Sequence, residues 1–143
     1  MKVSQLARKL NVAPDTVRFY TRIGIITPCI NTVNGYKEYN KRDQNRLRFV
    51  LSARNLGFSV KDIEEILGVS ETGKSGCPIV RDLIQRRLQE TEQRFLETAA
   101  LRNRMLSAVS EWRLKPDKEP TGDMVCHLIE EFSEVAMEEE KNE

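Results

Sequence analysis

The sequence predicts a mainly α-helical protein, with a winged helix-turn-helix domain followed by a long helix of the coiled-coil type. Three observations predict this fold. Two short helical segments near the N-terminus are separated by a break of three or four residues, which is the spacing of a helix-turn-helix. An Asn-Gly pair between β-prone residues follows them and predicts a hairpin, which in this position is a wing. A stretch of about 35 residues from Pro78 then carries a seam with heptad spacing, without glycine or an internal proline.

The first two helices are indicated by residues typical of helix ends. Ser4 is a residue type that caps helix N-termini, and the apolar periodicity after it predicts a helix to about Leu10. The pattern breaks at Asn11. Pro14 is tolerated at the first position of a helix, because the N–H that it lacks would have no partner there. We therefore expect a second helix from Pro14 to about Tyr20.

The hairpin and two further helices complete the N-terminal domain. Asn34-Gly35 is predicted to form the turn between residues 32–33 and 36–39. A helix is expected from Asp43 to residue 56, and another, capped by Ser59, to residue 67.

The elements divide the chain into four parts. We expect residues 1–70 to form the winged helix-turn-helix domain, residues 71–76 a hinge loop, residues 77–114 a dimerisation helix, and residues 115–143 a C-terminal sensor loop with a short helix and an acidic tail. Because so long a helix cannot bury its apolar stripe against a small domain, we expect it to pair with a second copy of the chain. The pattern alone leaves parallel and antiparallel pairing open. The seam consists of Ile84, Leu88, Thr91, Phe95, Thr98, Arg102, Met105, Val109 and Trp112.

The charge of the chain is unevenly distributed. The formal net charge is only +1, but residues 1–54 are strongly basic and the run 138–140 is acidic. A basic domain joined to an acidic body is typical of a DNA-binding domain with a separate dimerisation or sensing part. The chain has one histidine and shows no paired-acid motif, glycine-rich phosphate loop or nucleophile signature, which argues against an enzyme.

The sequence also predicts the compartment. No apolar run approaches the ~18 residues that span a bilayer, and residues 1–10 lack the apolar core of a secretory signal. We therefore expect a cytoplasmic protein without a membrane partner.

The three cysteines, Cys29, Cys77 and Cys126, are odd in number and widely spaced, so they do not form a disulfide framework.

Six residues are candidates for contact with double-stranded DNA. Three lie on the second helix, where a recognition helix meets the major groove, and three lie on the wing, where hydroxyls and a cation meet the backbone. They are Thr16, Arg18, Tyr20, Tyr36, Lys37 and Tyr39. Arg46, Arg48 and Arg54 extend this basic surface. The alternative is that the tyrosines at 20 and 39 belong partly to the core and that some arginines only make the surface soluble.

The order of these motifs resembles the MerR family of bacterial transcription regulators. The resemblance rests on Val17-Arg18-Phe19-Tyr20, Gly24-Ile25-Ile26, Asn34-Gly35-Tyr36-Lys37-Glu38-Tyr39 and Leu56-Gly57-Phe58-Ser59 with Asp62-Ile63. It implies a homodimer that binds a near-palindromic operator between promoter elements and distorts the DNA when an effector binds. RNA polymerase would then be affected indirectly, through the promoter.

Two cysteines and the histidine are candidate metal ligands. Cys77 lies at the start of the long helix, where the helix dipole favours a thiolate, and Cys126 is followed by His127. Two thiolates and an imidazole are a soft set that suits zinc, cadmium, lead or mercury. In an antiparallel dimer, Cys77 of one subunit would approach Cys126 and His127 of the other. Cys29 is expected to be a small apolar filler.

The set resembles that of the divalent-metal branch of the family, in which a cysteine stands at the first of these positions. The sequence departs from that branch at the end of the long helix, where Trp112-Arg113 stands in place of another cysteine. The fourth ligand is therefore open, with Asp123 or water as candidates. Two alternatives also stay open: the cysteines are packing residues of a sensor for something else, or they form a redox-switchable disulfide.

Overall fold

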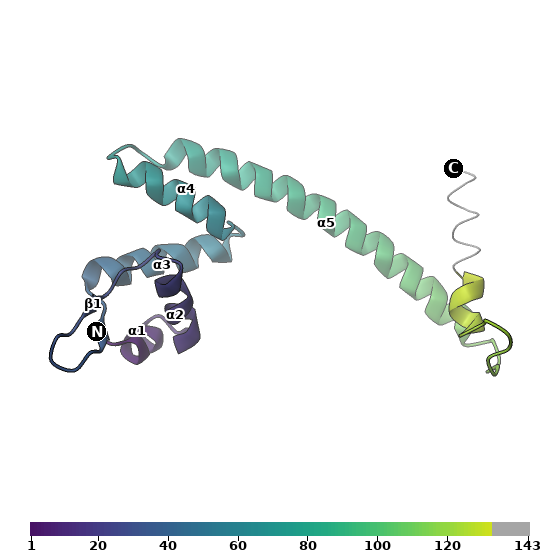
Figure 1. Ribbon diagram of the computed structural model, residues 1–143. Helices are drawn as coiled ribbons and strands as arrows, with labels where there is room; N and C mark the ends of the chain where they lie inside the picture. The colour runs from purple at the N-terminus through teal and green to yellow at the C-terminus, as the bar shows by residue number, and fades with distance from the viewer. Residues whose placement is uncertain (133–143) are drawn as a thin grey trace. The chain divides into compact units, whose positions relative to one another are not determined.

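The structure, a computed structural model, describes residues 1–132 (Figure 1). Its elements are α1 (Val3–Lys9), α2 (Pro14–Arg22), β1 (Cys29–Ile30), β2 (Lys37–Glu38), α3 (Lys41–Asn55), α4 (Val60–Glu71) and α5 (Cys77–Trp112). A last helical segment runs over residues 127–132. The chain divides into a first unit, residues 1–89, and a second unit, residues 90–143. The acidic run 138–140 and the end of the expected last helix lie outside the described residues.

The mainly helical fold is confirmed, with four corrections to helix ends. α1 begins at Val3, and the Oε1 atom of Gln5 accepts a hydrogen bond of 2.9 Å from the N–H of Lys2, so Ser4 is not the cap. α2 starts at Pro14 as predicted but continues past Tyr20 to Arg22. It ends there because Gly24 follows with a φ of +82°, a conformation that terminates helices.

The third correction concerns α3, which begins two residues before Asp43. Asn40 caps it by accepting a hydrogen bond of 2.9 Å from the N–H of Asp43, while the Asp43 carboxylate accepts one from the N–H of Asn40. Ser59 caps α4 as predicted, in the same reciprocal arrangement with Asp62. The fourth correction is the end of α4, which continues past residue 67 to Glu71.

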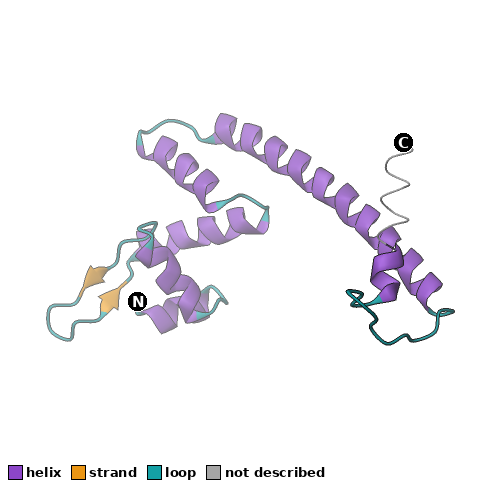
Figure 2. Ribbon diagram, turned by 45° about the vertical axis from the view of Figure 1, so that its right-hand side comes forward, coloured by secondary structure: helices purple, strands orange, loops and turns teal. Residues whose placement is uncertain are grey.

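The wing forms, but not around a two-residue turn. β1 and β2 are antiparallel and pair Cys29 with Glu38 and Ile30 with Lys37 (Figure 2). The connection therefore spans residues 31–36. The Oδ1 atom of Asn31 accepts hydrogen bonds from the N–H groups of Val33 (2.8 Å) and Asn34 (3.3 Å), which folds the chain before the glycine is reached. This Asx arrangement competes with a tight Asn-Gly turn and explains the longer loop.

One apolar core joins the helices of the first unit. Val17 of α2, Leu47 of α3 and Ile63 of α4 are completely buried in it. Leu83 of α5 is buried in the same core, and Ile79, Val80 and Ile84 pack against it. The first turns of α5 are therefore part of the helix-turn-helix unit and are not a separate stalk.

The seam of α5 beyond this core is open. Phe95 is 71% exposed, and Leu96, Met105 and Val109 are also exposed in the single chain. Apolar patches of this kind on a helix mark interaction surfaces. None of the described helices combines the length and the hydropathy needed to cross a bilayer.

A partly buried ion pair fastens α5 to α4 inside the first unit. The Nε atom of Arg87 lies 3.1 Å from Oδ2 of Asp62, whose side chain is only 7% exposed and also caps α4. Removing one partner of such a pair leaves a buried charge without its counter-ion.

We predict that Arg87→Met lowers the free energy of unfolding by about 1 to 3 kcal/mol, the range for leaving a buried polar group without its partner. Urea unfolding followed by circular dichroism measures the change. Arg86→Met, at an exposed neighbouring position, is the control and should shift the free energy of unfolding by less than about 0.5 kcal/mol. Equal effects of the two substitutions would contradict the fastening role of Arg87.

Candidate nucleic-acid interface and metal-binding residues

α2 presents one face to the core and the other to solvent. Val17 is fully buried, whereas Arg18 keeps 60% of its side chain exposed and Thr16 is partly exposed. The Nη1 atom of Arg18 lies 2.8 Å from Oδ1 of Asp15, one helical turn earlier. This exposed pair contributes little to stability, but it keeps the guanidinium near the N-terminus of α2, the part of a recognition helix that reaches base edges.

The wing offers an aromatic ring and cations. Tyr36 is 58% exposed and Lys37 is exposed. The Nζ atom of Lys2 lies 4.7 Å from the centre of the Tyr36 ring, a cation–π contact. The chain start is held beside the wing because the N–H of Tyr39 donates to the carbonyl of Met1 at 2.7 Å. Lys2 is thus a candidate contact residue that the sequence analysis missed, since the pairing joins residues far apart in the chain.

Two of the expected contact residues are corrected by the structure. Tyr39 is 1% exposed, and its hydroxyl forms a hydrogen bond of 2.7 Å with Oγ1 of Thr21. Tyr20 is 6% exposed and packs edge-to-face against Phe19, with ring centres 5.0 Å apart. Both tyrosines therefore belong to the core that holds α2 against the wing, which is the alternative that the sequence left open for them.

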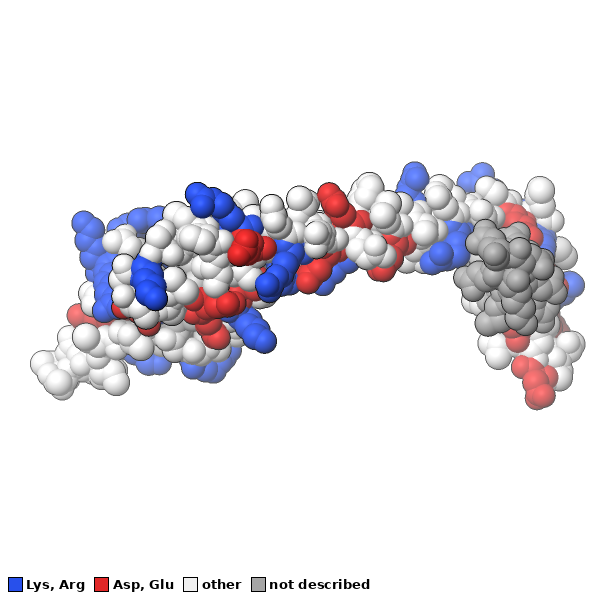
Figure 3. Space-filling model, turned by 90° about the horizontal axis from the view of Figure 1, so that it is seen from above, with Lys and Arg blue, Asp and Glu red and all other residues white. Residues whose placement is uncertain are grey.

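Two arginines expected on the basic surface also have structural roles. Arg46 donates from Nε to the carbonyl of Ile25 at 2.6 Å and pairs with Glu71 at 2.8 Å. Arg54 donates to the carbonyl of Phe58 at 2.8 Å. Arg48 stays exposed and keeps its charge toward solvent. Lysines and arginines nevertheless gather on several parts of the first unit (Figure 3).

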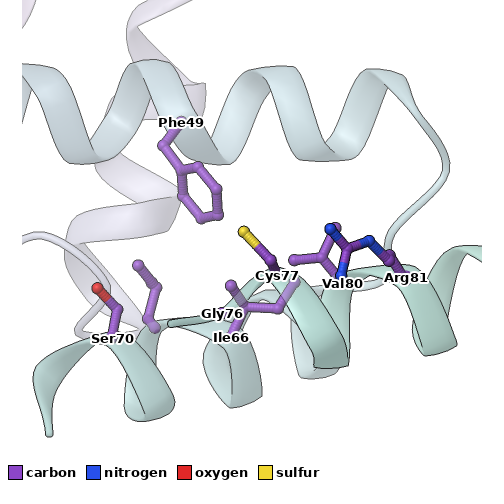
Figure 4. A pocket seen from close by; sticks show the side chains of 8 residues that line it. Phe49, Ile66, Ser70, Gly76, Cys77, Val80 and Arg81 are labelled. Atoms are coloured by element: carbon purple, nitrogen blue, oxygen red, sulfur yellow. The ribbon is translucent and has the colours of Figure 1, made fainter. Parts of the chain in front are cut away.

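Cys77 is the first residue of α5, as predicted, and is exposed in the single chain. Its sulfur points into an apolar groove of about 430 Å³ within the first unit, toward the ring of Phe49 (Figure 4). Ile66 and Val80 also line this groove. Cys29, expected as a filler, is exposed on β1 instead, because the two-residue strand lies outside the core.

His127 is held within the second unit by one ring nitrogen. It is 5% exposed, and Nε2 lies 2.9 Å from the carbonyl oxygen of Pro116. Its Nδ1 atom is buried and forms no hydrogen bond with any of residues 1–132. Cys126, just before it, is partly exposed, and its N–H donates to Oε2 of Glu130 at 3.0 Å.

Two contacts place the short helix of residues 127–132 against the end of α5. The Nζ atom of Lys115 lies 2.9 Å from Oε2 of Glu131, and the rings of Trp112 and Phe132 meet edge-to-face at 6.1 Å. The hydrogen bond to Lys115 lowers the pKa of Glu131, although partial burial opposes this effect. The same bond raises the pKa of Lys115.

The donor atoms of a single chain do not complete a metal site. Among residues 1–132, no three His, Cys, Asp or Glu side chains lie close enough together to hold an ion. Cys77 belongs to the first unit, whereas Cys126 and His127 belong to the second. The buried, unpartnered Nδ1 of His127 is nevertheless the kind of atom that a divalent metal would bind.

The chain matches two family models, and together they cover most of its length. Residues 1–68 match the MerR HTH family regulatory proteins, and residues 44–108 match the model described as MerR, DNA binding. The regulator ZntR of Escherichia coli K12 is 33% identical over 101 residues, which are 70% of this chain and 72% of that protein. The chain belongs to the MerR family. It is therefore a DNA-binding transcription regulator, as predicted, and not an enzyme.

Two further MerR proteins show how far the similarity extends. The mercuric resistance operon regulatory protein of Bacillus cereus is 30% identical over 110 residues, which are 77% of this chain and 83% of that protein. The structure of MerR from Bacillus megaterium in complex with mercury(II) matches with a TM-score of 0.52 and 25% identity. It covers 89% of this chain and 94% of that one. The MerR fold thus extends beyond the DNA-binding domain into the C-terminal part of the chain.

We predict that Arg18→Ala weakens binding to a promoter fragment selected by the wild-type protein by about 1 to 3 kcal/mol, or roughly 5- to 150-fold. Fluorescence anisotropy at several salt concentrations measures the affinity and its salt dependence. A phosphate contact would lower the salt slope by about one, whereas a guanine contact would relax sequence preference. Arg113→Ala, an exposed arginine of the second unit, is the control. An unchanged affinity for Arg18→Ala would exclude Arg18 from the interface.

We predict opposite effects for two tyrosine substitutions on the wing. Tyr39→Phe removes the hydroxyl that bonds to Thr21 and should lower the free energy of unfolding by about 1 kcal/mol, with DNA affinity unchanged at temperatures where the protein is folded. Tyr36→Phe should leave stability unchanged and weaken DNA binding. Thermal unfolding and anisotropy distinguish the two, and a loss of DNA affinity for Tyr39→Phe without a loss of stability would restore Tyr39 to the interface.

Proposed function

We propose that the chain acts as a homodimer that binds a near-palindromic promoter operator and responds to a divalent metal ion. The metal would be zinc, cadmium, lead or mercury, held by Cys77 of one subunit and by Cys126 and His127 of the other. Metal binding would change the angle between the two DNA-binding domains, so that the DNA is bent and untwisted and RNA polymerase meets a realigned promoter. A regulator that acts on promoter DNA in this way would work in the cytoplasm.

The single observation that carries the metal response is the pair of donor groups at the two ends of α5. The sulfur of Cys77 lies at the N-terminus of the helix, and the imidazole of His127 lies just beyond its C-terminus with Nδ1 unpartnered. Antiparallel pairing of two copies would bring these ends together. The exposed seam of α5, including Phe95 and Val109, supports such pairing.

The relatives favour the same class of effector. One is named a mercuric resistance operon regulatory protein, and another was solved with mercury(II). The departure at Trp112-Arg113 means that this chain lacks a cysteine at the end of α5, so its ligand set would hold fewer thiolates than the metal-sensing branch usually has. A set with fewer thiolates would therefore differ from the sets of that branch in its preference among soft and borderline ions.

The DNA contacts in this proposal come from the exposed residues alone. Arg18 and Thr16 of α2 would meet the major groove, and Tyr36 and Lys37 of the wing would meet the backbone, with Lys2 beside them. Because one core fixes the positions of the elements that carry these residues, the first unit would bind DNA as a single rigid domain. The two DNA-binding domains of a dimer would each bind one half of the operator.

We predict that the reduced, metal-free protein binds one ion at each site formed by Cys77 of one subunit with Cys126 and His127 of the other. Binding should produce thiolate-to-metal charge-transfer absorption in the ultraviolet. Cys77→Ser or Cys126→Ser should abolish this absorption, because each removes one of two thiolates, whereas Cys29→Ser should leave it unchanged. A twist-sensitive footprint of promoter DNA should change when metal is added to the wild-type protein only.

Three outcomes would count against the metal response. The first is the absence of binding with any of the four ions. The second is an unchanged footprint at metal saturation. The third is a footprint that responds to oxidant in metal-free buffer and requires Cys77 and Cys126, which would favour the thiol-based redox regulator in its place.

A further inference from the structure

We infer that Glu131 is an additional metal ligand and that His127 and Glu131 form a two-atom half-site for a borderline divalent ion, zinc rather than mercury. The inference rests on the proposed metal response and names its ion class and its missing ligand. The two donor atoms are Nδ1 of His127 and Oε1 of Glu131, which lie 3.6 Å apart in the second unit.

The first step is the tautomer of His127. A carbonyl oxygen can only accept a hydrogen bond, so the contact of 2.9 Å between Nε2 and the carbonyl of Pro116 requires the proton to be on Nε2. Neutral imidazole then carries its lone pair on Nδ1. Histidine ligands of metals usually donate their other N–H to a carbonyl or carboxylate in this way, which fixes the ring and raises its basicity.

The second step is the position of that lone pair. Nδ1 is buried in a side chain that is only 5% exposed, and no described residue forms a hydrogen bond with it. Leaving a buried polar atom unpaired costs free energy, about 1 to 3 kcal/mol. A structural histidine would be expected to form hydrogen bonds with both ring nitrogens, whereas Nδ1 has only the carboxylate of Glu131 at 3.6 Å, beyond hydrogen-bond distance. This arrangement favours a ligand that is added later.

The third step is the distance to Glu131. Zinc lies about 2.0 to 2.1 Å from histidine nitrogen and about 2.0 to 2.2 Å from carboxylate oxygen, so two ligands on one tetrahedral ion are roughly 3.3 to 3.5 Å apart. The observed 3.6 Å is close to this edge length. His127 and Glu131 are four residues apart on one helix, which places both side chains on the same face.

The fourth step is the availability of the carboxylate. Lys115 contacts Oε2 of Glu131, and the other oxygen, Oε1, is the one that faces His127. Glu130, the neighbouring acid, is already engaged, because both of its oxygens accept hydrogen bonds from the backbone N–H groups of Val125 and Cys126. Glu131 is therefore the carboxylate of this helix whose free oxygen is directed at the imidazole.

The ligand count then suits zinc. His127 and Glu131 supply two ligands from one chain, and the thiolate of Cys77 from a second copy would supply a third. Within residues 1–132, Cys126 does not form a group of three with these two donors, so its side chain would have to turn toward the ion to complete a four-coordinate set, and water is the other candidate. Nitrogen and oxygen ligands favour a borderline ion, whereas a soft ion such as mercury is satisfied by the two thiolates. This explains how a chain without the second cysteine at the end of α5 could still hold zinc.

The test compares zinc and mercury binding to the full-length, reduced protein and its Glu131→Gln and His127→Gln variants. We expect both substitutions to weaken zinc binding roughly 10- to 100-fold or more, as losses at metal sites do, and to leave mercury binding unchanged. X-ray absorption of the zinc-loaded wild-type protein should show nitrogen or oxygen scatterers beside sulfur, with one fewer in Glu131→Gln.

Two controls separate ligation from the local ion pair. Glu119→Gln makes the same charge change at an exposed position of the preceding loop and should leave zinc affinity unchanged. Lys115→Met breaks the ion pair with Glu131 but removes a positive charge near the site, so zinc affinity should hold or rise. Circular dichroism confirms that each variant is folded, and Glu131→Gln tests the inference alone if His127→Gln does not fold, because Glu131 is only half-buried.

The failure of this inference is distinguishable from the failure of the metal response. Charge transfer in the wild-type protein with zinc affinity unchanged in Glu131→Gln would overturn the half-site and leave the metal response intact. An equal loss of zinc affinity in Lys115→Met and Glu131→Gln would assign Glu131 to the ion pair and also overturn it. No metal binding by the wild-type protein would overturn both.

Discussion

The burial of the first turns of α5 in the core of the first unit is the constraint on which the rest of the molecule depends. Leu83 shares that core with Val17 of the recognition helix, and Arg87 pairs with the buried Asp62 of α4. Because protein interiors are close-packed, these elements move together. Cys77 lies at the start of the same helix, so an ion held there would act directly on the body that carries the DNA contacts.

The same core decides which polar side chains remain for DNA. The hydroxyl of Tyr39 is used to bind Thr21, and the guanidinium of Arg46 is used to hold the carbonyl of Ile25. Tyrosine and arginine are typical of nucleic-acid interfaces, yet here these two residues stabilise the first unit. The exposed set is smaller and comprises Arg18 on α2, with Tyr36 and its neighbours on the wing. A small, rigidly spaced set suits recognition that depends partly on the deformability of DNA.

In the second unit, some polar side chains are paired with one another and one ring nitrogen is left without a hydrogen bond among the described residues. Lys115 and Glu131, together with the ring contact of Trp112 and Phe132, hold the short helix against the end of α5 without a metal. The loop is thus ordered in advance, which lowers the entropic cost of arranging ligands when an ion binds. Under the proposed metal response, an ion bound at Nδ1 of His127 would be shared between subunits, and dimerisation and metal binding would then reinforce one another.

Apolar periodicity and residues typical of helix ends determined the fold class, the wing and the place of Cys77 at the start of α5, because these depend on near neighbours in the chain. They also determined the family, through the joint order of its motifs. Only the tertiary structure decided that Tyr20 and Tyr39 are core, that Lys2 joins the wing and that Nδ1 of His127 faces Glu131. Burial and hydrogen-bond partners depend on segments brought together by folding, and residue type and spacing carry no record of them.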